Sequence, residues 1–359
     1  MNFIFCYQLF PNTGWGTISV NYVNLLKKKK IIIICNKKNN KISLPQYELL
    51  RDPLNYIYNP FLIFIDLIKI KNFIKKNIED ESSSHFLVEP YILFLPFIYN
   101  FFINNYYYCH GTYSLRLFNN LKTKLFFLFS LKKITHVIFS SNYTKLKILK
   151  KFSFPKITKK SILNLFFNFK IKYYKPSKKF FVLSVGAVKD RKGYHNLIKV
   201  ADIVVNKLNY NIIFYVVGEV SDHKYFETIK LKVNYYKLTN NFIFLGKLDK
   251  KNLDKYYQNA SLFIMLSEDI NDYFEGFGLV YLEALSRGRE VIISDQTGAT
   301  DLKQINKYIF ISNPKNYNYI AKYIVKIFLN KNHVNHIRNL DTVKKYKKLN
   351  LSNFNKFFN

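Results

Sequence analysis

The sequence Glu-Gly-Phe-Gly-Leu-Val-Tyr-Leu-Glu-Ala-Leu, residues 275–285, decides how the second half of this chain folds. Two carboxylates stand eight positions apart, and a Gly-Phe-Gly turn directly follows the first of them. From Leu279 onward the apolar residues have helical spacing, and no proline interrupts them. Ahead of the turn, Ala260 to Leu266 is a short apolar run typical of a buried parallel strand. We therefore predict a strand, a glycine turn and a helix, in that order.

This order of elements places backbone N–H groups and the positive end of a helix against a bound anion. The two glycines let the backbone adopt unusual φ/ψ angles and come close to a ligand. We expect Glu275 on the loop and Glu283 in the opening turns of the helix. Because carboxylates repel phosphate, their natural partners are hydroxyl groups, and sugars carry many of them.

Length and composition indicate a folded protein with an anionic partner. The chain has 359 residues, enough for two domains of ordinary size, and 49% of them are hydrophobic. Its formal net charge of +33 favours nucleic acid, acidic lipid or phosphorylated substrates as partners. A second explanation carries equal weight, because Lys, Asn, Ile, Phe and Tyr are the residues that A+T-rich codons encode.

The positive charge is concentrated in the first half of the chain. Residues 1–175 hold 27 Lys and Arg against 7 acids, and no acid occurs between Glu89 and Asp190. Phe, Tyr and Leu alternate with these cations, which suits an anionic membrane surface. We expect no nucleic-acid partner, because no recognised nucleic-acid-binding motif is present.

Cysteine usage and hydropathy bear on the compartment. The three cysteines are odd in number and lack metal-type spacing, which favours a reduced cytoplasmic compartment. Met1 leads straight into an expected strand, so we expect no signal peptide. The most apolar stretch, roughly residues 86–109, contains Glu89 and two prolines. It is interpreted as buried α/β core or a surface-seeking segment, not a membrane span.

The first half opens with a β-loop-α-β pattern. A strand from Asn2 to Phe10 leads into a loop with Gly14 and Gly16, then a helix to about Lys28 and a strand at Ile31 to Cys35. In a doubly wound fold, phosphates bind at this first loop, although an ordinary tight turn also explains Gly-x-Gly. Residues 36–85 show no clear pattern.

A further ligand group is expected after the strand Asn104 to Cys109. His110 follows it directly beside a glycine, at the carboxyl end where open α/β sheets place ligand groups. A single histidine is more often structural, but this position favours a role in binding. A strand at Ile134 to Phe139 and a capped helix at Tyr143 to Lys150 come next.

The second half alternates strands and helices after a connection at residues 151–179. A strand at Phe180 to Val185 is followed by a loop at 186–193 and a helix at Tyr194 to Lys207. Further strands are expected at 212–217, 242–245, 260–266, 291–294 and 309–311, and helices at 223–237, 253–258 and 316–329. This alternation predicts βαβ units with right-handed crossovers.

Lys192 is the candidate cation of the loop at 186–193. It precedes Gly193, where a cation can grip a diphosphate, although most lysines in so basic a chain are simply solvated. The other candidate residues favour a functional role for it, because Lys192, Glu275 and Glu283 all follow strands of one predicted domain.

These motifs resemble glycosyltransferase family 4, the retaining nucleotide-sugar transferases of GT-B fold, also called glycosyl transferases group 1. The matching pieces are the Glu-x7-Glu stretch 275–283, the Ser-Val-Gly…Arg-Lys-Gly run 184–193, and the short motifs at 217–219, 244–246, 266–267 and 294–301. The resemblance is strong over roughly 180–330. Before that it rests on Gly14 and Gly16, on His110-Gly111-Thr112 and on residues 141–144.

The resemblance implies an α/β protein of GT-B fold, with two Rossmann-like doubly wound domains facing each other across a cleft. Residues 1–175 would bind the acceptor and residues 176–330 the nucleotide-sugar donor. Residues 331–359 would form a helical tail that packs back towards the N-terminal domain.

The resemblance also implies roles for individual residues. Glu275 would hold the donor sugar and Glu283 the ribose hydroxyls. Lys192 would neutralise the diphosphate leaving group, and His110 would touch the donor sugar. The remaining donor-binding positions would be Gly14, Gly16, Gly186, Arg191, Phe277, Gly278 and Leu279. No cofactor is expected: family members work without a divalent metal, and the chain has no Asp-x-Asp metal motif.

The chain departs from the family pattern at three places. Ala187 stands where an Arg is usual, and Arg191 is a candidate to replace it. Phe167-Asn168 stands near the usual Asn-Gly, and Ala299 replaces a second glycine.

The expected function is transfer of a hexose-type sugar from a nucleotide diphosphate sugar to a glycan or lipid-linked acceptor. The expected setting is the cytoplasmic face of a membrane, during surface polysaccharide or lipopolysaccharide assembly. The alternative is a degenerate GT-B protein that binds nucleotide or glycan without turnover, which Ala187 favours.

Overall fold

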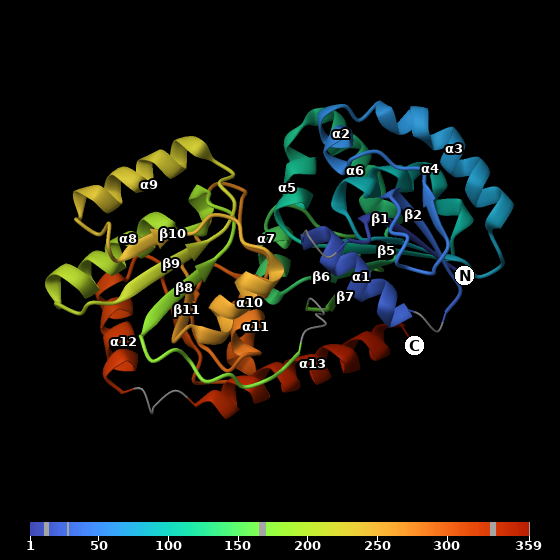
Figure 1. Cartoon of the computed structure of the whole chain (residues 1–359). Helices are drawn as coiled ribbons and strands as arrows, with labels where there is room; N and C mark the ends of the chain where they lie inside the picture. The colour runs from blue at the N-terminus through green and yellow to red at the C-terminus, as the bar shows by residue number, and fades with distance from the viewer. Residues whose placement is uncertain (11–13, 27–28, 165–169, 331–334, 359) are drawn as a thin grey trace. The chain divides into compact units, whose positions relative to one another are not determined.

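A computed structural model describes residues 1–10, 14–26, 29–164, 170–330 and 335–358. The chain divides into two compact units. Unit 1 comprises Met1–Asn168 together with Ser352–Asn359, and unit 2 comprises Phe169–Leu351. Each unit is built around its own parallel sheet (Figure 1).

Unit 1 contains a seven-stranded sheet in the order β3-β2-β1-β4-β5-β6-β7. All neighbouring strands pair in parallel, with Ile4 of β1 opposite Ile33 of β2 on one side and His85 of β4 on the other. The strands are β1 Asn2–Gln8, β2 Ile31–Lys37, β3 Gln46–Glu48, β4 Ser83–Phe86, β5 Asn104–Cys109, β6 His136–Phe139 and β7 Lys159–Ile162.

The helices of unit 1 connect these strands. They are α1 Gly14–Leu26, α2 Pro53–Tyr58, α3 Leu62–Asn77, α4 Leu95–Ile98, α5 Thr112–Asn119, α6 Leu121–Lys133 and α7 Asn142–Leu149, with short 3-10 turns at Glu89–Phe94 and Tyr99–Phe101. Ser141 caps α7 by accepting a hydrogen bond from the Thr144 N–H, which satisfies an otherwise unpaired donor of the first turn.

Most of the apolar stretch at 86–109 is buried core, which is one of the two interpretations that the sequence left open. Every residue from Phe86 to Leu95 is buried. None of the described helices has the length and apolar character needed to cross a lipid bilayer.

Unit 2 contains a six-stranded parallel sheet in the order β10-β9-β8-β11-β12-β13. The strands are β8 Phe181–Val185, β9 Ile213–Val217, β10 Phe242–Phe244, β11 Leu262–Met265, β12 Glu290–Ser294 and β13 Phe310–Ser312. The helices are α8 Tyr194–Asp202, α9 His223–Tyr235, α10 Lys250–Asn259, α11 Leu279–Leu285, α12 Tyr317–Leu329 and α13 His336–Phe358, the last of which ends in unit 1.

One face of the unit 2 sheet is sealed by α8 and α12. Ile198 of α8, Ile324 of α12 and Ile264 of β11 belong to one buried apolar cluster. Ligands of open α/β sheets bind at the carboxyl edge of the strands rather than on a covered face.

The predicted α/β class with two Rossmann-like units is confirmed. Two segments contain elements that the sequence did not predict: residues 36–85, for which no prediction was made, contain β3, α2, α3 and β4, and the connection at 151–179 contains β7. The loop residues 11–13 and the Phe167-Asn168 pair, which the sequence singled out, lie outside the described residues.

The last turn of α13 packs on aromatic rings of unit 1. The rings of Phe354 and Phe358 lie 6.2 Å and 5.9 Å from that of Tyr22. Phe357 contacts His136 with ring centroids 5.4 Å apart. Residues 352–358 are therefore grouped with unit 1 by their contacts, with Phe354 as their buried side chain.

Candidate active site

The backbone of Glu275 is fixed at the carboxyl edge of the unit 2 sheet. Glu275 forms an isolated parallel bridge with Thr297, just beyond the end of β12. Its carbonyl accepts a hydrogen bond from the Gly298 N–H at 3.2 Å. The carboxylate thus stands where a ligand of an open sheet would bind.

The glycine turn after Glu275 requires Gly278. Its φ of +88° lies in the left-handed region, and a Cβ at this position would lie 3.0 Å from the Tyr281 ring. The Tyr281 hydroxyl in turn donates to the Met265 carbonyl at 2.7 Å, which fastens α11 to the end of β11. Phe277 is buried, with its ring 5.5 Å from that of Tyr346, so only its backbone is available to a ligand.

Two glycines bring the loop at 186–193 against the neighbouring strand ends. A Cβ on Gly193 would lie 1.7 Å from the Leu266 carbonyl oxygen, and one on Gly218 would lie 1.9 Å from the Gly186 carbonyl oxygen. Only glycine permits so close an approach of backbones. Gly186 in turn is close to Lys192, whose Cε lies 3.5 Å from the ideal Cβ position.

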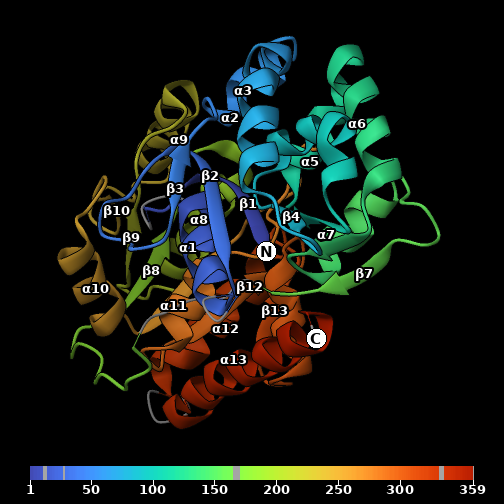
Figure 2. The same ribbon diagram turned by 90° about the vertical axis from the view of Figure 1, so that its right-hand side faces the viewer.

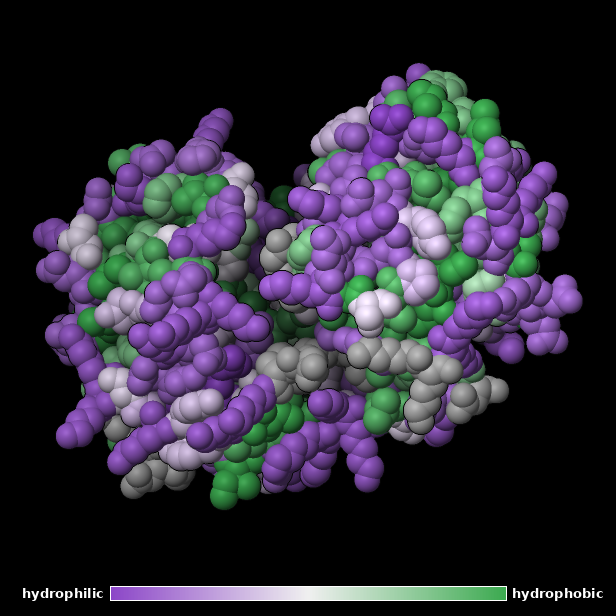
Figure 3. Space-filling view, turned by 45° about the vertical axis from the view of Figure 1, so that its right-hand side comes forward, coloured by the Kyte–Doolittle hydropathy of each residue, from purple (hydrophilic) through white to green (hydrophobic). Residues whose placement is uncertain are grey.

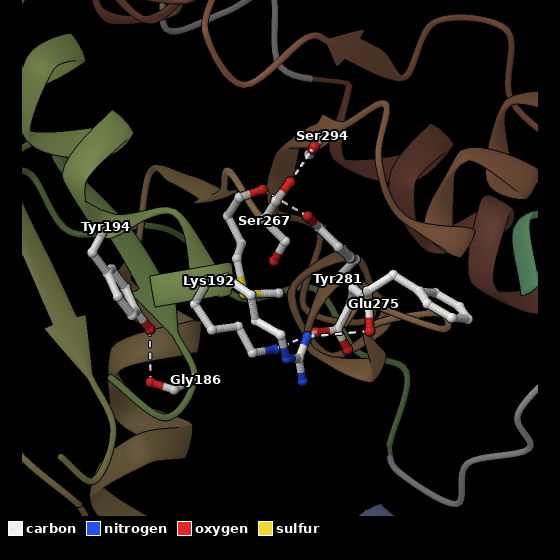
Figure 4. Close-up of polar contacts among 10 residues, drawn as sticks. Gly186, Lys192, Tyr194, Ser267, Glu275, Tyr281 and Ser294 are labelled. Carbon is white, nitrogen blue, oxygen red and sulfur yellow. Dashed lines mark hydrogen bonds and ion pairs between the residues drawn. The ribbon is translucent and has the colours of Figure 1, made fainter. Parts of the chain in front are cut away.

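This packing places two cations on a single carboxylate oxygen. Arg191 Nη1 lies 2.7 Å and Lys192 Nζ 2.6 Å from Oε2 of Glu275. Figure 4 shows the Lys192 side chain extending from its loop to Glu275. Beside it, the Tyr194 hydroxyl donates a hydrogen bond to the Gly186 carbonyl. The three charged side chains are between 11% and 20% exposed, so solvent screens their attraction only weakly.

Burial and charge act in opposite directions in this cluster. Burial raises the pKa of Glu275, but Lys192 and Arg191 outweigh it and hold that pKa well below its usual range. Burial lowers the pKa of Lys192, and the Glu275 carboxylate opposes this effect. The carboxylate is therefore ionised at neutral pH.

Lys189 adds a third cation that the sequence interpretation overlooked. Burial, followed by repulsion from Arg191 and Lys192, lowers its pKa to about 8. The loop thus carries more positive charge than Glu275 neutralises, which favours an anionic ligand. Its place in the same loop as Lys192 was the signal available in the sequence.

The loop is held from its other side by Glu268. The Glu268 N–H donates to the Arg191 carbonyl at 3.0 Å. The Glu268 carboxylate lies 2.7 Å from His195 Nε2 and 3.6 Å from Lys315 Nζ. These contacts fix the backbone that carries Arg191.

Glu283 lies in α11, as expected, but its described contacts are not with the cation cluster. Burial raises the pKa of Tyr257 in α10, and the nearby Glu283 carboxylate raises it further. Glu283 therefore faces α10, while Glu275 faces the loop after β8.

The remaining predicted residues belong to unit 1. Gly14 begins α1, with no described atom within 4 Å of its ideal Cβ, and Gly16 is buried in the same helix. His110 Nε2 lies 2.6 Å from the Leu87 carbonyl oxygen, while Nδ1 finds no hydrogen-bond partner among the described residues. Burial lowers the His110 pKa to about 4, so the imidazole is neutral near pH 7.

Glu89 is a second residue that the sequence interpretation did not place in a site. Trp15, which lies between Gly14 and Gly16, donates from its indole to Glu89 Oε2 at 3.0 Å. Burial raises the pKa of Glu89 to about 7, opposed by hydrogen bonds that include the His110 and Gly111 backbone. The sequence signal was its position as the one acid of an apolar stretch.

Comparison with protein families and solved structures gives consistent results. Residues 166–341 match the model of the family described as glycosyl transferases group 1. No match was found among the curated proteins.

Three similar structures cover nearly the whole chain. HepE of Anabaena, solved in complex with UDP, has a TM-score of 0.71 and 15% identity over 99% of this chain and 96% of its own. Sucrose-phosphate synthase from Thermosynechococcus elongatus has a TM-score of 0.74 and 16% identity, with 99% and 98% covered. The lipopolysaccharide outer core galactosyltransferase WaaB, in its apo form, has a TM-score of 0.71 and 16% identity, with 99% and 98% covered. At these identities the similarity establishes the GT-B fold alone.

Proposed function

We propose that this chain, which belongs through residues 166–341 to the glycosyl transferases group 1 family, is a retaining hexosyltransferase that uses a nucleotide diphosphate sugar as donor. The observation that carries the proposal is the pairing of Arg191 and Lys192 on Glu275 beside the glycine turn. The UDP complex of the similar HepE structure supports a nucleotide ligand.

The cation cluster suits the charge that develops in this reaction. As the glycosidic bond breaks, negative charge grows on the leaving diphosphate, and fixed cations stabilise it most in a site of low water content. Lys192 and Arg191 would supply those cations, with Arg191 replacing the Arg that family members have at the position of Ala187. Its support is the shared oxygen, since Arg191 reaches the same Glu275 atom as Lys192.

The other roles follow the family assignment. Glu275 would hold the donor sugar with the backbone of the glycine turn, and Glu283 would bind the ribose hydroxyls. Gly14 and Gly16 would approach the diphosphate, and His110 would contact the donor sugar as a neutral imidazole. The proposed reaction needs no divalent metal.

We further propose a glycan or lipid-linked acceptor in surface polysaccharide or lipopolysaccharide assembly, at the cytoplasmic face of a membrane. The similarity to WaaB and the basic character of residues 1–175 support this part.

Transfer assays test the proposal. Purified protein would be incubated with labelled UDP-sugars and GDP-sugars, membrane lipids and EDTA, and both transferred sugar and released nucleotide would be measured. We expect Lys192→Ala to lower turnover by about 10²-fold or more, as for loss of one transition-state donor. Lys247→Ala, which removes an exposed ion pair with Glu219, is the matched control and should leave turnover unchanged. Full turnover in both Lys192→Ala and Glu275→Ala would show the assigned roles to be wrong.

Ala187 supports a second candidate function, a protein that binds nucleotide without turnover. Stabilisation by UDP or GDP in a thermal-shift measurement, with no sugar released on long incubation, would favour it over the transferase.

A further inference from the structure

Helix α3 exposes apolar side chains on the face that a water-soluble helix normally keeps polar. Its inner face packs Ile63, Ile70 and Ile74 into the core with no exposure. Its outer face carries Ile65 and Ile68, which are 56% and 67% exposed. The same side of unit 1 also includes Phe61 at 53% and Phe64 at 42%.

Helix α6 repeats this arrangement. Leu121, Leu125 and Leu128 are 72%, 51% and 37% exposed, and Phe129 is 56% exposed. Their spacing of four, three and one residues aligns them on one stripe along the helix.

The two stripes form one surface. Lys122 of α6 lies over the Phe61 ring at 5.1 Å, and the rings of Phe64 and Phe126 are 5.8 Å apart. Both ribbon views place α3 and α6 on the same side of unit 1 (Figures 1 and 2). In Figure 3, hydrophobic atoms lie among hydrophilic ones at several places on the surface, one of which is the upper right, where α3 runs. The α3–α6 surface is defined by Phe61, Phe64, Ile65, Ile68, Leu121, Leu125, Leu128 and Phe129.

Lysine is the main charged residue of the two helices themselves, while the acids Glu79, Asp80 and Glu81 follow the end of α3. The two helices together contain eight lysines, and their one acid is Asp66. Asp66 is buried and accepts hydrogen bonds from Arg51 Nε at 2.9 Å and the Tyr56 hydroxyl at 2.8 Å. The lysines are Lys69, Lys71, Lys75, Lys76, Lys122, Lys124, Lys132 and Lys133.

We propose that the α3–α6 surface binds an anionic lipid bilayer. Phe, Ile and Leu side chains of this size would enter the boundary between headgroups and acyl chains, while the lysines beside them would pair with lipid phosphates. Charge complementarity selects this partner, because an apolar protein interface is usually depleted of Lys at its core. The inference rests on the membrane location proposed above, but not on the sugar-transfer reaction.

Vesicle sedimentation tests the surface with the full chain. We expect binding to phosphatidylcholine vesicles that contain phosphatidylglycerol, little binding to pure phosphatidylcholine, and weakening by salt. The triple substitution Ile65→Ser, Ile68→Ser and Leu125→Ser should reduce binding by about ten-fold or more. Leu231→Ser and Tyr235→Ser, at 69% and 80% exposed positions of α9, form the matched control and should retain it.

Three further measurements decide between outcomes. Unchanged thermal unfolding of the triple variant shows that it is folded, because all three side chains are exposed. Undiminished vesicle binding by that variant would overturn the proposal, as would a dimer in solution that the variant abolishes. A thermal shift with UDP reports separately on the donor site. If the protein binds vesicles but UDP gives no thermal shift, that result counts against the proposed function alone.

Discussion

At the scale of single residues, Glu275 is the group on which the site depends. Two cations lie within 2.7 Å of one of its oxygens and share its single negative charge, and all three side chains are largely withdrawn from water. Glu275→Gln would leave Arg191 and Lys192 unpaired beside each other. We expect a loss on the order of 3 kcal/mol in the free energy of unfolding, measured in urea.

An anion should replace the missing carboxylate in that variant. Added pyrophosphate or UDP would restore more stability to Glu275→Gln than it adds to the original protein. Glu219→Gln is the control, because its ion pair with Lys247 is exposed and worth about 0.5 kcal/mol. If Glu275→Gln unfolds at the same urea concentration as the original protein, the pairing of Arg191 and Lys192 with Glu275 does not stabilise the fold.

The sequence supports the grouping of Lys192 with Glu275, because both follow strands of one parallel sheet. It does not reveal that Arg191 shares the same oxygen, since this depends on how the turn at 190–192 orients two successive side chains. It marks Glu89 as the one acid of an apolar stretch, but it does not reveal the raised pKa of about 7, which arises from burial in three dimensions.

At the scale of elements, close backbone packing fixes the loop that carries the cations. Gly193 and Gly246 have nearly equal φ angles of +69° and +66°, yet only Gly193 faces a backbone atom. Gly193→Ala would place Cβ 1.7 Å from the Leu266 carbonyl oxygen and force the loop away from β11. We expect it to cost well over the ~1 kcal/mol that a left-handed alanine costs.

Gly246→Ala measures that backbone cost alone, because nothing lies within 4 Å of its ideal Cβ. Urea unfolding of the two variants gives the difference between them. Equal destabilisation would mean that the contact between the loop and β11 relaxes without cost. If Gly193→Ala folds, its UDP-induced thermal shift should also be smaller than that of Gly246→Ala.

The elements that sequence patterns missed have different physical causes. β3 and β7 are the two edge strands of the unit 1 sheet, and their burial is partial. An edge strand needs no continuous apolar run, so Lys-Lys-Ser-Ile in β7 resembles a loop. Helix α3 was missed for a different reason. Its outward face is apolar too, so the sequence lacks the alternation of apolar and polar faces that marks a surface helix. β4 is a central, fully buried strand, but its sequence Ser-Ser-His-Phe is largely polar and was missed as well. The other central strands were predictable from their apolar runs.

At the scale of the whole molecule, three buried histidines make stability depend on pH. Burial lowers the pKa of His85 to about 3, and those of His110 and His136 to about 4, from an ordinary value of 6.5. Between these values the unfolded chain binds protons that the folded chain does not. Their contribution is therefore complete above pH 6.5 and is lost as pH falls, by about 1.4 kcal/mol per pH unit for each histidine.

Glu89 acts in the opposite direction in the same range. Its pKa is raised from 4.5 to about 7, so the folded chain binds one proton more than the unfolded chain between those values. One carboxyl opposes three histidines, and the net effect is a loss of stability as pH falls from 6.5 towards 4.5. Urea unfolding at a series of pH values would measure this slope.

Glu89→Gln separates the two contributions. The amide oxygen can still accept the Trp15 indole hydrogen bond, so the fold should persist while the opposing titration disappears. The loss of stability below pH 6.5 should then become steeper, by up to about 1.4 kcal/mol per pH unit, because the histidines act without opposition. A constant stability from pH 7 to pH 5 in this variant would show that the histidines are not held neutral by burial. A slope unchanged from that of the original protein would instead show that Glu89 is already ionised in the folded state.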